Sequence, residues 1–334
     1  MLAVRLLVPL ATVGAMAFEI NEHKITSLMA AVYTPMKGPG SLELDLDRIM
    51  PYAKFLKSKN ITNVMPAGSN GESLSLTVPE RKALAEAWGK AGQATGLKIY
   101  MHVGSESLPE SMDLTAHASK TPGIYGAVCM SPVYFKPTLE TLHDFLAHTA
   151  SAAPDFPFWF YHFPDDTGVL AGQVNKLLGM IEESGRIPNF MGIKYTDYNL
   201  MDFSLCKQVK NGKYNMLFGR DEQALAAFDL GADAAVSSTV NYAPSLREAI
   251  QAYQSGDKAL AWAKQAENAR LCSLFGQFES QGKNVQKNII KMSGMDVGPS
   301  RLPKRDLDAA EYEALKAQLV SLKMIDVPVS EFTV

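Results

Sequence analysis

The chain has 334 residues, of which 47% are hydrophobic and 20% charged, a composition typical of globular domains that excludes disordered, collagen-like and coiled-coil classes. Its 32 Lys and Arg residues against 35 Asp and Glu residues leave a formal net charge of −3, which gives no overall field to recruit nucleic acid or an anionic membrane. Cys129, Cys206 and Cys272 are widely spaced and match neither a disulfide framework nor a zinc site. They favour a reducing compartment, the cytoplasm.

Residues 1–17 allow two interpretations. Arg5 is followed by an apolar stretch, Leu6–Ala17, whose ending Ala15-Met16-Ala17 is the small-x-small pattern of a secretory signal. Alternatively, the segment is an extended start upstream of an internal methionine, Met16. The stretch is too short to span a bilayer, and no later segment is apolar for long enough. A functional signal would make the protein secreted rather than cytoplasmic.

From residue 27 onward, short apolar runs alternate with amphipathic stretches. The runs are continuously apolar, which is typical of strands covered on both faces. The expected strands are Ser27–Pro35, Thr62–Ala67, Lys98–Gly104, Gly126–Ser131, Phe156–His162, Phe190–Tyr195, Tyr214–Phe218 and Ala232–Ser237. The expected helices lie near Leu46–Ser58, Glu80–Gly92, Leu108–Lys120, Leu139–Ala152, Ala171–Glu183, Leu200–Lys210, Glu222–Leu230 and Ser245–Ser255. Thr77-Val78-Pro79-Glu80 predicts a capping box with proline in the first turn.

Eight strand signals, each followed by a helix signal, predict a closed (β/α)₈ TIM barrel over residues 25–255. A doubly wound open sheet is the alternative, but it needs fewer strands and a nucleotide-binding turn. The chain has neither the G-x-G-x-x-G nor the P-loop pattern. Beyond residue 256 the helical patterns continue without new strands, which predicts a C-terminal helical appendage over 256–334. Its expected helices are Lys258–Phe275, Val285–Met292 and Leu307–Leu322.

In such barrels the active site is built at the C-terminal ends of the strands and in the loops that follow. Polar residues occur at these positions after most of the expected strands. The candidates are Ser69, Asn70, Tyr134, Tyr161, Lys194, Thr196, Gly219, Asp221, Glu222 and Ser238. The six histidines form no metal-ligand pattern, so we expect no metal site.

Lys194 is the most informative candidate, because it lies inside an otherwise apolar strand. Desolvation disfavours an ammonium ion there and should depress the pKa. A neutral amine can attack a carbonyl group and form a Schiff base. A lysine paired with a carboxylate, or one at a strand end reaching water, fits the position equally well.

Three further groups of candidates also have two interpretations each. Gly68–Gly71 offers backbone N–H groups and two side-chain donors that suit a carboxylate, or it is simply a tight turn. The hydroxyl of Tyr161 can relay a proton, although an aromatic residue at a strand end more often belongs to the core. Asp221 and Glu222 either bind sugar hydroxyls or begin a helix, where acidic residues are favoured.

Three motifs together resemble the N-acetylneuraminate lyase and dihydrodipicolinate synthase superfamily of class I aldolases. Gly68-Ser69-Asn70-Gly71-Glu72 is similar to its Gly-[Ser/Thr]-Thr-Gly-Glu loop, and Tyr161–Gly168 to its Tyr-x-x-Pro-x-x-Thr-Gly segment. Gly192-Ile193-Lys194 is similar to its Schiff-base lysine motif, and the resemblance extends over Ile25–Leu302. The sialate lyases of animals are the most similar branch, on the segments Asn70–Thr77, Phe218–Gln223 and Gly298–Pro303.

The resemblance implies reversible cleavage of N-acetylneuraminate to N-acetylmannosamine and pyruvate, with no metal or organic cofactor. Lys194 then forms the imine with the C2 ketone, and Tyr161 transfers a proton at the C4 hydroxyl. Tyr134 matches a tyrosine that some members insert into a neighbouring subunit's site, which implies an oligomer, most simply a homotetramer. The loop residues that hold the substrate carboxylate are Ser69 and Asn70, and the residues that contact the sugar hydroxyls are Thr196, Gly219, Asp221, Glu222 and Ser238.

Two departures from the superfamily pattern bear on the chemistry. Asn70 stands where members usually have threonine, and Asp166 stands where the synthases have a carboxylate-binding arginine and sialate lyases an apolar residue. An acid at 166 argues against synthase activity, because it would repel the second substrate's carboxylate. It leaves open a related aldolase or dehydratase acting on another 2-keto-3-deoxy sugar acid. A barrel that binds a keto acid or sialate without turnover is the non-enzymatic alternative.

Overall fold

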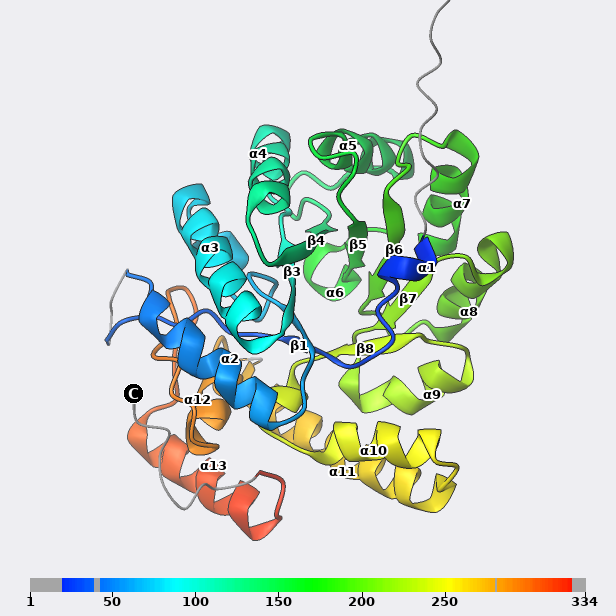
Figure 1. Cartoon of the computed structure of the whole chain (residues 1–334). Helices are drawn as coiled ribbons and strands as arrows, with labels where there is room; N and C mark the ends of the chain where they lie inside the picture. Colours follow the sequence, from blue (N-terminus) through cyan, green and yellow to red (C-terminus); the bar gives the residue numbers. More distant parts are fainter. Residues whose placement is uncertain (1–19, 39–42, 280, 326–334) are drawn as a thin grey trace, which may run out of the picture.

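The computed structural model describes residues 20–38, 43–279 and 281–325, so the segment 1–17 lies outside the described residues. Eight parallel strands close into a barrel in the order β1 to β8, with helices arranged around the outside (Figure 1). β1 pairs with β8 through Met29 and Val236, which closes the sheet. The predicted (β/α)₈ architecture is therefore confirmed. The strands are β1 Met29–Ala31, β2 Asn63–Met65, β3 Lys98–His102, β4 Ile124–Met130, β5 Phe158–His162, β6 Phe190–Tyr195, β7 Asn215–Phe218 and β8 Ala234–Ser237.

The helices between the strands follow the expected pattern. Thr77 and Glu80 form the predicted capping box at the start of α3, with each side chain accepting a hydrogen bond from the other's backbone N–H. The α-helices of the barrel are α2 Ile49–Ser58, α3 Val78–Thr95, α4 Leu108–Lys120, α5 Leu139–Ser151, α6 Pro164–Thr167, α7 Val174–Ser184, α8 Leu200–Gln208, α9 Ala224–Asp229 and α10 Ser245–Gln254. Short 3₁₀ turns are η1 Leu46–Arg48, η2 Ser73–Ser75, η3 Val209–Gly212, η4 Asp221–Gln223 and η5 Thr239–Asn241.

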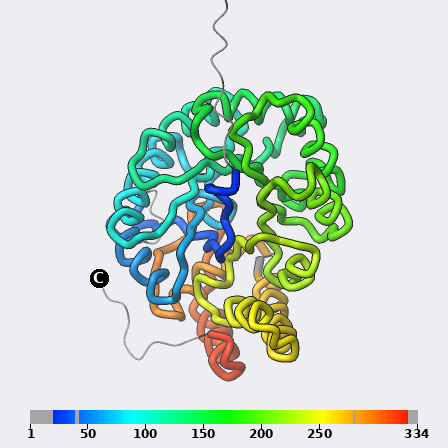
Figure 2. Tube along the Cα trace, turned by 45° about the vertical axis from the view of Figure 1, so that its right-hand side comes forward, coloured from blue at the N-terminus to red at the C-terminus, as the bar shows by residue number. Residues whose placement is uncertain are grey.

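The N-terminal end of the barrel is closed by the segment that precedes β1. The helix α1, Ile20–His23, lies across this end (Figures 1 and 2). Just after it, the backbone N–H of Ile25 donates to Oδ1 of Asn215 (3.0 Å), and Nδ2 of Asn215 donates back to the Ile25 carbonyl (3.0 Å). Trp159 Nε1 also donates to Asn215 Oδ1 (3.3 Å). The open end is therefore the C-terminal end of the strands.

Three further helices follow the barrel, as expected for the appendage. They are α11 Lys258–Glu279, α12 Val285–Met292 and α13 Ala309–Ser321. Figure 2 shows α11 beside α10 and the α12–α13 segment against one side of the barrel. Gln265 Nε2 donates to the Asp221 carbonyl (2.9 Å), and Asn268 Nδ2 to Thr239 Oγ1 (2.9 Å). The appendage thus fixes the loops after β7 and β8 at the open end.

Candidate active site

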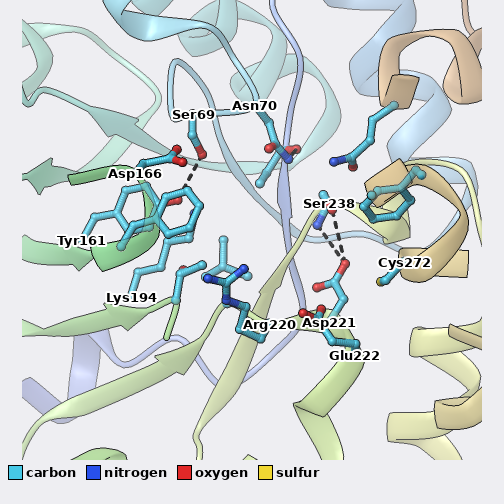
Figure 3. A pocket seen from close by; sticks show the side chains of 18 of the residues that line it. Ser69, Asn70, Tyr161, Asp166, Lys194, Arg220, Asp221, Glu222, Ser238 and Cys272 are labelled. Carbon is cyan, nitrogen blue, oxygen red and sulfur yellow. Dashed lines mark hydrogen bonds between the residues drawn. The ribbon is translucent and has the colours of Figure 1, made fainter. Parts of the chain in front are cut away.

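A cavity of about 400 Å³ opens at the C-terminal ends of the strands. Nine of the ten predicted residues line it (Figure 3): Ser69, Asn70, Tyr161, Lys194, Thr196, Gly219, Asp221, Glu222 and Ser238. Tyr134 is the exception, since its side chain is 79% exposed and packs edge-on against Phe135, away from the cavity lining. A role for Tyr134 in a neighbouring subunit's site stays a prediction.

Lys194 lies on β6, opposite Tyr161 on β5, and is only 4% exposed. Its Nζ atom is 3.6 Å from the centroid of the Tyr161 ring. Burial lowers the pKa of the Lys194 amine to about 7, while the charge of Asp221 raises it and that of Arg220 lowers it. No ion pair joins Lys194 to a carboxylate within the described part of the chain. A substantial fraction of the amine is therefore neutral, and nucleophilic, near neutral pH.

Tyr161 combines a buried ring with a hydroxyl in the cavity. The hydroxyl lies 3.0 Å from Oγ of Ser69, close enough for a hydrogen bond in either direction. Burial raises the pKa of the Tyr161 phenol, so it is protonated at neutral pH. The ring stacks on Phe163 (centroids 5.9 Å apart). The hydroxyl can thus accept a proton only by passing its own to a neighbour such as Ser69.

The loop with Ser69 and Asn70 is held by a buried ion pair. Glu72 adopts a left-handed conformation (φ 57°), and its carboxylate lies 2.8 Å from Nζ of Lys287 on α12, with both side chains almost fully buried. The backbone N–H of Arg301 donates to the same carboxylate (2.9 Å). Gly71 is required by close packing, because a Cβ there would lie 2.8 Å from the Ala67 backbone. The loop is a tight turn that also presents two donors to the cavity, so both interpretations of the sequence apply.

The loops after β7 and β8 are joined through Asp221, which both begins η4 and lines the cavity. Its Oδ2 accepts hydrogen bonds from the backbone N–H groups of Ser238 (3.1 Å) and Thr239 (2.9 Å) and from the Ser237 hydroxyl (2.8 Å). Burial raises the pKa of the Asp221 carboxyl, and these hydrogen bonds oppose the shift. Tyr198 donates to the Glu222 carboxylate (2.6 Å).

Gly219 leaves room for the side chain of Thr196. A Cβ at residue 219 would lie 2.0 Å from Thr196 Oγ1, a distance that no substituted residue can tolerate without displacing the hydroxyl. The glycine therefore sets the position of a neighbouring cavity residue rather than contributing a side chain.

Several lining residues were not predicted from the sequence. Arg220 and Tyr198 lie on barrel loops but carried no motif signal. Others come from the appendage: Cys272, Phe275, Lys283, Gln286 and Lys304. Asp166, noted as a departure from the superfamily pattern, also lines the cavity, and burial raises the pKa of its carboxyl against the lowering effect of Lys304 and Arg220.

Within residues 20–38, 43–279 and 281–325 there is no group of three or more His, Cys, Asp or Glu side chains that could hold a metal ion. Among the same residues, no helix combines the length and apolar character needed to cross a membrane.

Comparison with known proteins places this geometry in a family. The model of the "Dihydrodipicolinate synthetase family" matches residues 24–322. N-acetylneuraminate lyase A of Xenopus laevis is 36% identical over 308 residues, an alignment that covers 90% of this chain and 98% of the Xenopus protein. N-acetylneuraminate lyase of Homo sapiens is 34% identical over 308 residues, which cover 91% of this chain and 94% of the human protein. The structure of Proteus mirabilis N-acetylneuraminate lyase superposes with a TM-score of 0.83 at 29% identity, covering 90% of this chain and 100% of that one. The chain belongs to the dihydrodipicolinate synthetase family.

Proposed function

We propose that this protein is a Schiff-base lyase that cleaves N-acetylneuraminate reversibly to N-acetylmannosamine and pyruvate. Relatives named N-acetylneuraminate lyase align with about nine-tenths of the chain at 34–38% identity, which supports the activity and the enzyme class. The observation that carries the proposal is the buried amine of Lys194, 3.6 Å from the centroid of the Tyr161 ring in one cavity.

In the first step, the Lys194 amine attacks the C2 ketone, and loss of water gives a protonated imine. Ser69 and Asn70 hold the substrate carboxylate, because they present donors from a loop fixed by the Glu72–Lys287 ion pair. The iminium nitrogen then serves as the electron sink, so the scheme needs no metal ion or organic cofactor.

In the second step, the C3–C4 bond breaks. Its electron pair moves into the iminium group and forms an enamine, while the C4 hydroxyl becomes the aldehyde of the released sugar. Tyr161 accepts the proton of the C4 hydroxyl and passes its own phenolic proton toward Ser69, 3.0 Å away, and the carboxylate held there. Protonation of C3 and hydrolysis of the imine then release pyruvate and restore the lysine. Thr196, Gly219, Asp221, Glu222 and Ser238 contact the sugar hydroxyls during these steps.

The proposal extends to the compartment and the oligomeric state, which we expect to be the cytoplasm and a homotetramer. The cytoplasm is supported by the free thiols of Cys129, Cys206 and Cys272, which suit a reducing compartment. The adjacent exposed rings of Tyr134 and Phe135 support an association surface. Sedimentation equilibrium of the wild type and of Tyr134→Ala tests the assembly, and a monomeric wild type would contradict it.

Asp166 favours one second candidate, a related lyase or dehydratase acting on another 2-keto-3-deoxy sugar acid, since it adds a carboxyl group to the cavity wall. Pyruvate release from N-acetylneuraminate, followed with lactate dehydrogenase and NADH, tests the leading proposal. A kcat/KM that is highest for a short keto acid in the same assay would favour the second candidate. Binding of N-acetylneuraminate without pyruvate release would favour the non-enzymatic alternative.

A further inference from the structure

The guanidinium group of Arg220 is held in the wall of the cavity by three neighbours. Its Cζ atom lies 4.1 Å from the centroid of the Tyr198 ring and 5.2 Å from that of the Phe163 ring, and Nη2 pairs with the carboxylate of Asp165. The side chain is 14% exposed, whereas Asp165 is 54% exposed. Stacking on rings and pairing with a carboxylate both use the planar shape of the group, so its orientation is fixed before any ligand arrives.

Arg220 lies between the residues of the chemical step and those proposed to bind the sugar. It separates Gly219 from Asp221 in the chain, and Figure 3 shows its side chain between Lys194 and Asp221. Each of its two aromatic neighbours contacts one of these sets of residues. Phe163 stacks on Tyr161 of the chemical step, and the Tyr198 hydroxyl donates to Glu222 of the proposed sugar site. A ligand reaching from Lys194 to Glu222 therefore passes the guanidinium group.

The guanidinium group keeps donors for such a ligand. An arginine has five N–H donors. In the described part of the chain, the carboxylate of Asp165 is the one hydrogen-bond acceptor recorded for Arg220, and the buried Nε has no partner. Because buried donors without acceptors cost free energy, an oxygen atom of a ligand is the natural partner for the remaining N–H groups that reach the cavity.

The charges around Arg220 nearly balance. Asp165 pairs with Arg220, and the carboxyl of Asp166 is influenced by Lys304 as well as by Arg220. Asp165, Asp166 and Glu222 thus accompany Arg220 and Lys304 on this side of the cavity. Such a set offers little net attraction to a second anionic group, such as a phosphate, but it can donate hydrogen bonds to neutral oxygens.

We propose that Arg220 is a specificity-determining residue that donates hydrogen bonds to the hydroxyl or amide oxygens of the substrate carbons remote from the keto group. Tyr198, Phe163 and Asp165 are the positioning residues that hold its guanidinium plane. The proposal rests on the proposed function only in taking a polyhydroxylated keto acid bound near Lys194 as the ligand. It assigns Arg220 no role in bonding to pyruvate, which lacks those remote carbons.

The test compares a long ligand with a short one. For Arg220→Gln we expect kcat/KM for N-acetylneuraminate to fall about 10- to 100-fold, mainly through KM, as for loss of a charged hydrogen bond. Trapping of the pyruvate imine with borohydride should change less than about 2-fold at its pH maximum.

Arg220→Lys keeps the charge but loses the planar fork, so it should restore little of the lost kcat/KM. Arg186→Gln, which removes an exposed arginine paired with Asp144, is the matched control and should match the wild type.

Imine trapping must be followed across pH 6–9, because the positive charge of Arg220 also lowers the pKa of Lys194. A loss of N-acetylneuraminate cleavage in Arg220→Gln that disappears at higher pH would show that Arg220 acts through the amine and would overturn the proposal. Equal losses for both ligands, or full activity of Arg220→Gln, would overturn it as well.

A binding measurement keeps this test separate from that of the proposed function. In a Lys194→Ala background, calorimetry should show that Arg220→Gln weakens N-acetylneuraminate binding about 10- to 100-fold without chemistry. If the wild type forms the pyruvate imine but does not cleave N-acetylneuraminate, the proposed substrate is wrong. The same variants compared on a panel of 2-keto-3-deoxy sugar acids then test Arg220, and unchanged kcat/KM across that panel would contradict the proposal.

Discussion

The Nζ atom of Lys194 lies 3.6 Å from the centroid of the Tyr161 ring, because the two residues are opposite each other on β6 and β5. Adjacent parallel strands thus bring the candidate nucleophile and the candidate proton carrier together through register alone. On the other side of β6, Gly192 lets β7 approach, since a Cβ there would lie 1.9 Å from the Asn215 carbonyl oxygen of β7. The pair therefore lies in the closed strand ladder of the barrel rather than in a loop.

Replacing Tyr161 with phenylalanine should separate imine formation from bond cleavage. The ring and its packing stay, but the hydroxyl beside Ser69 is lost. We expect borohydride trapping with pyruvate to continue and kcat for N-acetylneuraminate to fall about 10²- to 10⁴-fold. Tyr125→Phe, at an exposed tyrosine, is the control. Unimpaired cleavage by Tyr161→Phe would remove the hydroxyl from the mechanism.

The rate of imine formation should rise with pH through about 7. The protonated Lys194 amine cannot attack a ketone, and burial lowers its pKa to about 7, so the reactive fraction increases from pH 6 to 8 and then levels off. Single-turnover trapping with pyruvate across this range measures the midpoint. A midpoint near the ordinary lysine value of about 10.4 would show that the amine is not desolvated.

The same pKa shift predicts that Lys194 destabilises the fold. In the unfolded chain the amine titrates near its ordinary value, so between about pH 7 and 10 the unfolded state binds more protons at this residue than the folded state. The destabilising contribution of Lys194 should therefore shrink as pH rises through that window, and the free energy of unfolding of the wild type should increase. Lys194→Met should raise Tm at pH 7, and this gain should shrink toward pH 10. A lower Tm for Lys194→Met at pH 7 would contradict the desolvation argument.

The Glu72–Lys287 ion pair should support both stability and substrate binding. Lys287→Met leaves the Glu72 carboxylate buried without its partner, at a cost of about 3–5 kcal/mol, and releases the loop that carries Ser69 and Asn70. We expect a lower Tm together with a raised KM for N-acetylneuraminate. Lys291→Met breaks a half-exposed pair with Asp296 and should cost less than about 1 kcal/mol. An unchanged KM in a folded Lys287→Met protein would limit the pair to a structural role.

Adding one methyl group at Gly219 should damage the site. The new Cβ would overlap Thr196 Oγ1, so the hydroxyl must leave the cavity wall. We expect Gly219→Ala to lower kcat/KM for N-acetylneuraminate about tenfold or more. Gly179→Ala, in α7 with nothing within 4 Å of its added Cβ, should keep full activity. Equal activity of both variants would show that the Thr196 hydroxyl does not contact the substrate.

The barrel and most of its cavity lining could be predicted because both depend on local pattern. Each strand is a short apolar run, and a polar residue at the end of a strand faces the same opening whichever strand it follows. Strand limits were less accurate. The expected strand Ser27–Pro35 contains the three-residue strand β1. The Val32 N–H still donates to the Met65 carbonyl of β2 (3.3 Å), and the chain then leaves the sheet.

The unpredicted residues depend on long-range packing. Lys283, Gln286 and Lys304 reach the cavity only because the appendage folds back on the barrel, and helical periodicity does not encode that path. The helix α6 is a single turn, too short to produce a periodic signal. Arg220 lies in the loop after β7, where a charged residue is usually solvent-exposed. Its contacts with the Tyr198 and Phe163 rings appear only in the folded chain.

The identity of the residue that bonds to pyruvate tests the central claim most directly. Incubation of the protein with pyruvate and borohydride, followed by peptide mass analysis, should reveal a reduced pyruvate adduct on the peptide that contains Lys194 and on no other lysine. Lys194→Ala should form no adduct and release no pyruvate from N-acetylneuraminate, with its circular dichroism unchanged. An active wild type that yields no adduct at Lys194, or a Lys194→Ala variant that still releases pyruvate, would contradict the Schiff-base mechanism.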